Sequence, residues 1–175
     1  MRVLGIDPGL NITGYGLVEF NEIETPKLIE AGLIRTKPSF TLAQKLFRIH
    51  KSIKEIIEEL RPSVLVLEEL YSNYDYPRTA ILMGHARGVI SLAAQESNIQ
   101  LVGYSPLRIR KALLGRGNVT KEQVAKMVQH FLNLPKLPES NDITDALALA
   151  LGYMRIETGS PFRKRIIANK AGSKR

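Results

Sequence analysis

The sequence contains no cysteine and no tryptophan among its 175 residues. Without cysteine there can be no disulfide and no metal site built on thiolates, and the composition fits a reducing compartment. The longest apolar run, residues 146–154, is too short to span a membrane, and the first residues lack the pattern of a signal peptide. We therefore expect a cytoplasmic protein with no membrane partner.

Acidic residues are in the minority, with 17 Asp and Glu against 25 Lys and Arg and a formal net charge of +8. Such an excess favours a polyanionic partner, most often nucleic acid, although many basic proteins bind none. The chain is long enough for a sizeable core and shows no internal repeat or linker. We predict one domain over residues 1–156, followed by a basic, flexible tail over residues 157–175.

Hydrophobic periodicity divides the chain into short strands and amphipathic helices. Strands are expected at residues 2–7, 14–20, 27–36, 64–70 and 99–104, and helices at residues 42–60, 79–97, after 105, after 120, and from 140 or 141 to 154. Thr41 and Thr120 each begin a capping box, because a Gln follows three residues later, and Pro62 ends the first helix.

This order of elements predicts an α/β fold. Short spacers join the first three strands and suit antiparallel hairpins, whereas strands separated by a helix pair in parallel. The expected product is a mixed five-stranded sheet with helices on both faces and the first strand near its centre. Ligands collect at the carboxyl ends of the strands in such sheets, and Asp7 stands at that end of the first strand.

Asp7 closes an unusually apolar strand, residues 3–6, and two explanations are open. Asp-Pro-Gly is a strong turn signature in which the Asp side chain accepts backbone hydrogen bonds. Alternatively, the carboxylate belongs to a metal or phosphate site, because an ionised carboxylate at a buried strand end is costly unless it is compensated. The second explanation requires further carboxylates nearby.

Two other core elements also end or begin in acid. The strand at residues 64–67 runs into Glu68 and Glu69, and strand alternation puts only one of these two on a given face. Asp142 and Asp145 are three apart and share one side of the last helix. The helix dipole explains Asp142 well, but it explains Asp145 poorly, because Asp145 borders an apolar run.

Four converging negative charges require cations. Only three histidines are present, His50, His85 and His130, so oxygen ligation is expected, which suits Mg²⁺ or Mn²⁺ rather than Zn²⁺. Two such ions could stabilise the attacking and leaving oxygens of an in-line phosphoryl displacement. We expect His85, which lies within an apolar helix, to be a packed or hydrogen-bonded histidine and not a ligand.

Several stretches resemble the RuvC family of bacterial Holliday-junction resolvases over nearly the whole chain. They are LGIDPGLNITGYG, VLVLEELY, MGHARGV, LLGRGNVTKEQV and NDITDALALAL, in the family's order and spacing. The resemblance implies a ribonuclease-H-like fold and an endodeoxyribonuclease that resolves four-way junctions by paired symmetric nicks in recombination and DNA repair. It implies a homodimer and, as a partner, the branch-migration helicase complex.

The same resemblance assigns site residues. It implies that the acids bind two Mg²⁺ ions per active site, with Mn²⁺ as a substitute, and it selects Glu68 over its neighbour. The ligands are Asp7, Glu68, Asp142 and Asp145. Tyr71 matches an aromatic residue that contacts bases near the crossover, and Lys121 and Arg110 match basic residues near the scissile phosphate.

The basic residues also stand out without the resemblance. Between residues 105 and 126 one acid, Glu122, faces six basic residues: Arg108, Arg110, Lys111, Arg116, Lys121 and Lys126. Any one of them could be a solvated charge, but together they indicate a track for phosphates that includes Arg116.

The helix at residues 79–97 is apolar on more than one face, and Gly84 and Gly88 would permit close helix approach. It either mediates a dimer or is buried in its own core.

Three other functions remain open. They are a ribonuclease-H-fold nuclease acting on RNA, an ATPase of the actin type, for which one copy of the fold is too little chain, and an inactive nucleic-acid-binding module.

Overall fold

The computed structural model describes residues 1–21, 25–69 and 77–157. The central sheet has five strands in the order β3-β2-β1-β4-β5. They are β1 (Arg2–Asp7), β2 (Ile12–Glu19), β3 (Lys27–Arg35), β4 (Val64–Glu68) and β5 (Gln100–Tyr104). The first three strands pair antiparallel, and β4 and β5 continue the sheet in parallel from β1. The predicted mixed sheet with a central first strand is confirmed.

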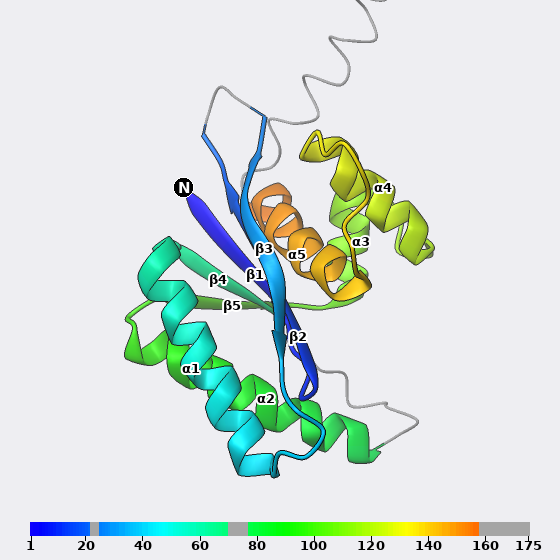
Figure 1. Ribbon diagram of the computed structural model, residues 1–175. Coiled ribbons are helices and arrows are strands. Elements are labelled where there is room, and N and C mark those ends of the chain that lie inside the picture. The colour runs from blue at the N-terminus through cyan, green and yellow to red at the C-terminus, as the bar shows by residue number, and fades with distance from the viewer. Residues whose placement is uncertain (22–24, 70–76, 158–175) are drawn as a thin grey trace, which may run out of the picture.

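Helices cover both faces of the sheet (Figure 1). One face carries α1 (Leu42–Leu60) and α2 (Pro77–Glu96), and the other carries α3 (Pro106–Leu114), α4 (Lys121–Phe131) and α5 (Asn141–Glu157). Alternation along each strand divides the core accordingly. In β1, Val3 packs toward α5, and Leu4 and Ile6 pack toward α1 and α2. No described helix is both long and apolar enough to cross a membrane.

The helix starts follow the predicted caps. Thr41 and Thr120 both form complete capping boxes, and Ser105 caps α3 with a proline in its first turn. Strand β2 starts two residues earlier than expected, since its antiparallel ladder with β3 begins where Ile12 pairs with Arg35. Helix α5 continues three residues beyond the expected end and stops at Glu157. The rest of the predicted basic tail lies outside the described residues.

Candidate active site

Asp7 and Glu68 lie next to one another at the carboxyl ends of two parallel strands. Val3 pairs with Val64, and the register continues to Ile6 beside Leu67, so the next step brings Asp7 beside Glu68. Both acids are in phase with Val3 and therefore face α5. The pairing with β1 thus separates the two glutamates, which strand alternation alone left unresolved.

The side chain of Glu69 points to the opposite face of the sheet from that of Glu68. Glu69 follows the β4 residues that pack toward α1 and α2, its side chain is exposed, and its Cγ lies beside Gly103 of β5. The structure therefore brings Glu68, and not Glu69, to the face shared with α5.

The start of α5 lies directly on the strands because two glycines leave room for it. Gly14 is the cross-strand partner of Asp7, and a Cβ at Gly14 would collide with the backbone carbonyl of Asp142. A Cβ at Gly5 would likewise collide with the carbonyl of Ala146, one turn further along. This close approach places Asp142 over β2 beside Asp7, with Asp145 one turn on.

The four acids share one electrostatic environment. Burial is the main cause that raises the pKa of Asp7 to about 7, followed by the charges of Glu68, Asp145 and Asp142 in that order. Burial is also the main cause of the raised pKa of Glu68 and of Asp145. Three neighbouring carboxyl groups with raised pKa values are typical of a site that functions with bound cations.

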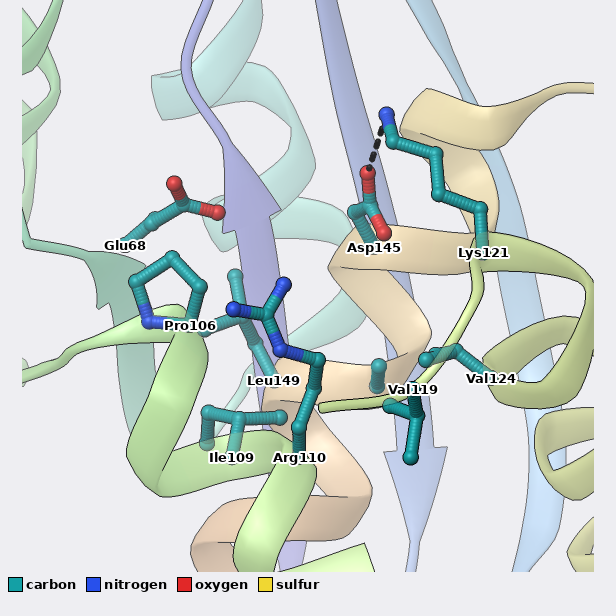
Figure 2. A pocket seen from close by; sticks show the side chains of 10 residues that line it. Glu68, Pro106, Ile109, Arg110, Val119, Lys121, Val124, Asp145 and Leu149 are labelled. Atoms are coloured by element: carbon teal, nitrogen blue, oxygen red, sulfur yellow. Dashed lines mark ion pairs between the residues drawn. The ribbon is translucent and has the colours of Figure 1, made fainter. Parts of the chain in front are cut away.

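Two basic side chains face this cluster. The Nζ of Lys121 lies 3.7 Å from Oδ2 of Asp145, and Lys121 is the first residue of α4, held there by the Thr120 capping box. Arg110 of α3 lies near enough to lower the pKa of both Glu68 and Asp145. Figure 2 shows Glu68 and Asp145 on two sides of one pocket, with the Arg110 guanidinium between them and Lys121 above Asp145.

The remaining basic residues of the predicted track do not reach the pocket. Lys126 pairs with Glu122 at 2.6 Å, and the Arg108 guanidinium lies 4.7 Å from the centre of the Tyr104 ring. Arg116 is exposed in the connection between α3 and α4. The other candidate for DNA contact, Tyr71, lies outside the described residues.

Arg87 of α2 is a functional candidate that sequence reasoning missed. Its charge lowers the pKa of Glu68, although α2 packs on the opposite face of the sheet. An arginine within a mostly apolar helix is typical of a solvated charge, so only the three-dimensional arrangement identifies Arg87. His85 of the same helix was expected to be packed or hydrogen-bonded and not a ligand. Its side chain is exposed and makes no hydrogen bond within the described residues, so the expected packing is wrong, while its exclusion as a ligand stays a prediction.

The connection after Asp7 decides between the two explanations of that residue. The hydroxyl of the buried Thr13 donates to the carbonyl of Gly9 at 2.7 Å, and a Cβ at Gly9 would collide with the carbonyl of Ile12, so the connection is compact. Residues 8 and 9 nevertheless form no turn, and Gly9 does not have the positive φ that the turn signature predicts. The turn explanation is therefore wrong, and the Asp7 side chain belongs with the neighbouring carboxylates.

The donor chemistry of the cluster suits a hard cation. Carboxylate oxygens are the ligands that Mg²⁺ and Mn²⁺ prefer, and the mutual repulsion of buried carboxylates favours a positive ion among them. Within the described residues, however, no three acidic or histidine side chains stand close enough together to form a closed metal site. The residue types fit the expected ions, and the arrangement is open.

Comparisons with known proteins show which family the chain resembles. A family model described as "Crossover junction endodeoxyribonuclease RuvC" matches residues 3–153. Over 151 residues the chain is 44% identical to the crossover junction endodeoxyribonuclease RuvC of Rhodopirellula baltica, covering 85% of this chain and 83% of that protein. For the same enzyme of Moorella thermoacetica the identity is 41% over 165 residues, with 94% and 96% covered.

Solved structures show the same likeness. Thermus thermophilus RuvC in complex with Holliday junction substrate has a TM-score of 0.84 and 33% sequence identity to this chain, over 90% of this chain and 97% of that one. The structure of a fowlpox virus resolvase, with a TM-score of 0.57 and 18% identity, shares the fold alone.

Proposed function

The chain belongs to the RuvC family of crossover junction endodeoxyribonucleases, and we propose that it resolves four-way DNA junctions by paired, symmetric nicks during recombination and repair. The observation that carries the proposal is the placement of Asp7 and Glu68 side by side under the start of α5, where Asp142 and Asp145 join them. Such a cluster performs phosphodiester hydrolysis in a ribonuclease-H-like fold.

In this proposal the four carboxylates hold two Mg²⁺ ions per active site, with Mn²⁺ as a substitute. Bound there, the ions would activate a water and neutralise charge on the scissile phosphate. Lys121, the first residue of α4, stands beside Asp145 and is largely exposed, so its ammonium can reach a phosphate that enters the pocket. It would stabilise negative charge that develops in the transition state.

Arg110 is the second phosphate contact in the proposal. Its side chain lines the pocket together with Glu68 and Lys121. Among the described residues, the buried Nε–H of Arg110 has no hydrogen-bond acceptor. A planar guanidinium can bind two phosphate oxygens at once, so it suits orientation of the backbone as well as charge neutralisation. Tyr71 is assigned to a base contact by resemblance to the family, and Arg116 is assigned to a DNA contact because it belongs to the basic track at residues 105–126.

The proposal includes a homodimer, because a junction offers two equivalent strands to a two-fold symmetric enzyme. Helix α2 supports it. Its buried side contains Ala86 and Ile90, whereas Ile81 is 62% exposed and Leu92 is 51% exposed on the other side, with Gly88 open between them. The proposal also includes a branch-migration helicase as a partner, which rests on family resemblance. We further propose that the protein acts in the cytoplasm, where the DNA lies.

An RNA-directed nuclease of the same fold is the alternative. A direct comparison separates the two: the protein is incubated with Mg²⁺ and a mobile four-way DNA junction, the matching linear duplex, or a structured RNA. We expect symmetric nicks in the junction and almost none in the duplex or the RNA. Cleavage of RNA with an intact DNA junction would overturn the proposed function.

A further inference from the structure

A second basic surface lies outside the active site. Residues 35–51 contain five Lys and Arg and no Asp or Glu. They cover the end of β3 and the first half of α1. We call the exposed or half-buried cations Arg35, Lys37, Lys45 and Arg48 the basic edge.

The basic edge is joined by hydrogen bonds to the β1–β2 connection that follows Asp7. The Thr36 N–H donates to the carbonyl of Asn11 at 3.0 Å, and the Thr36 hydroxyl donates to the carbonyl of Leu10 at 2.9 Å. From α1, the Nζ of Lys45 donates to Oδ1 of Asn11 at 2.6 Å. Figure 1 shows the end of β3, the start of α1 and the β1–β2 connection at the same lower end of the sheet.

Folding does not explain these charges. A helix is stabilised by acids in its first turn and by bases in its last turn. Helix α1 has neither, and its charges run in the reverse order, with Lys45 and Arg48 in the first half and Glu58 and Glu59 in the last turn. Within the described part of the chain, Arg35, Lys37 and Arg48 pair with no carboxylate.

Aromatic side chains lie among the cations. Phe47 stands between Lys45 and Arg48 in the sequence and is 68% exposed, and the Lys37 ammonium lies 5.7 Å from the centre of the Phe40 ring. Cations interspersed with accessible aromatic rings are typical of surfaces that bind nucleic acids. The surface adjoins the β1–β2 connection that follows Asp7, so among polyanionic partners the DNA held at the carboxylates is the one it suits.

We propose that the basic edge binds the phosphate backbone of a duplex arm of the junction, beside the point where the strand is cut. The inference rests on the proposed function, since it names a second contact with the same substrate. Because Asn11 lies four residues after Asp7, an arm held at the basic edge continues directly from a strand at the carboxylates. The surface would then fix the direction in which one arm leaves the active site.

The test is junction binding across a salt series in the presence of EDTA, for wild type and for the double variant Lys37→Gln/Arg48→Gln. Each phosphate contact adds about 0.9 to the slope of log affinity against log salt, so we expect the slope to fall by about two units. Each single variant should lose about one unit. The matched control is Lys27→Gln, which removes one exposed charge from the opposite end of β3.

Additional measurements separate binding from folding and chemistry. The charge-preserving variant Lys37→Arg/Arg48→Lys should keep the wild-type slope. The melting temperature of Lys37→Gln/Arg48→Gln should be unchanged or higher than that of wild type. Neither removed cation pairs with a carboxylate of the described residues, and Arg48 lies in the first half of α1, where positive charge is unfavourable. Single-turnover cleavage at subsaturating protein should fall together with binding, and it should recover as the protein concentration is raised. A double variant with the wild-type slope, or Lys27→Gln with as large a loss per charge, would overturn the inference. Failure of wild type to prefer junction would instead overturn the proposed function.

Discussion

Gly14 of β2 lies directly beneath the backbone of Asp142 at the start of α5. Because Gly14 is also the cross-strand partner of Asp7, a single position without a side chain brings the last helix down onto the strand that carries the first acid. The geometry of the carboxylate cluster thus depends on a residue that has no chemistry of its own.

Substitution of Gly14 by alanine should therefore damage catalysis more than a typical surface change. Its Cβ would meet backbone atoms of Asp142, which cannot rotate away, and overpacking of this kind costs about 1–3 kcal/mol. A displacement of about 1 Å at the acids should lower single-turnover cleavage by about 100-fold. The control is Gly103→Ala, whose Cβ would meet only the flexible Glu69 side chain. Equal activities of the two variants would contradict this role of Gly14.

The raised pKa of Asp7 makes metal-free stability depend on pH. With a folded pKa of about 7 against 3.8 in the unfolded chain, the folded protein holds the proton more tightly. Its stability therefore falls as pH rises from about 4 to about 7, by up to about 4 kcal/mol. Asp7→Asn cannot ionise, so in EDTA its free energy of unfolding should exceed that of wild type at about pH 8 and match it near pH 4.

Denaturant unfolding at several pH values measures this difference. Addition of Mg²⁺ should stabilise wild type more than Asp7→Asn, and uptake of the ion should release protons near neutral pH. If Asp7→Asn were no more stable than wild type in EDTA at alkaline pH, Asp7 would not experience the repulsion described here.

Much of the architecture follows from local sequence signals, but the selection of one glutamate does not. Alternation along β4 shows that Glu68 and Glu69 face opposite sides, yet it does not say which side holds α5. The pairing of Val3 with Val64 settles this, because it puts Glu68 in phase with Asp7. Strand register and helix placement are long-range properties, whereas periodicity and caps are local ones.

The same distinction explains the other differences from the sequence predictions. The charge count between residues 105 and 126 could not show that Lys126 is paired within α4 while Lys121 reaches across to Asp145. The apolar context of His85 indicated burial, but α2 buries only one of its sides against the sheet and α1. A helix that is apolar all round can be exposed on the side that a second copy would cover.

Substitutions at Lys121 and Asp145 should affect junction binding and cleavage differently. Asp145→Asn removes negative charge beside the DNA, so junction binding should persist or tighten while cleavage fails. Lys121→Ala removes a phosphate contact, so the salt slope of binding should fall by about one unit, and cleavage should slow even at saturating protein. Binding titrations paired with single-turnover cleavage measure both. Loss of binding by a folded Asp145→Asn variant would contradict this division.

Gly88 offers a test of the dimer. A Cβ at Gly88 would meet no atom of the single chain. Because Ala favours a helix over Gly by about 1 kcal/mol, Gly88→Ala should keep or raise the melting temperature at low protein concentration. If two α2 helices pack closely there, the added methyl should instead weaken dimerisation, by about tenfold or more. Sedimentation across a concentration series measures the change. A dimer unaffected by both Gly88→Ala and Ile81→Glu would place the interface elsewhere.

The most direct test of the account compares Glu68→Gln with Glu69→Gln. The two changes are chemically identical and adjacent in sequence, but only Glu68 faces the carboxylate cluster under α5. The measurement is single-turnover cleavage of a mobile four-way junction in Mg²⁺ at saturating protein. We expect Glu68→Gln to lose nearly all cleavage, whereas Glu69→Gln should stay within a few-fold of wild type. Full cleavage by Glu68→Gln, or equal loss in both variants, would contradict it.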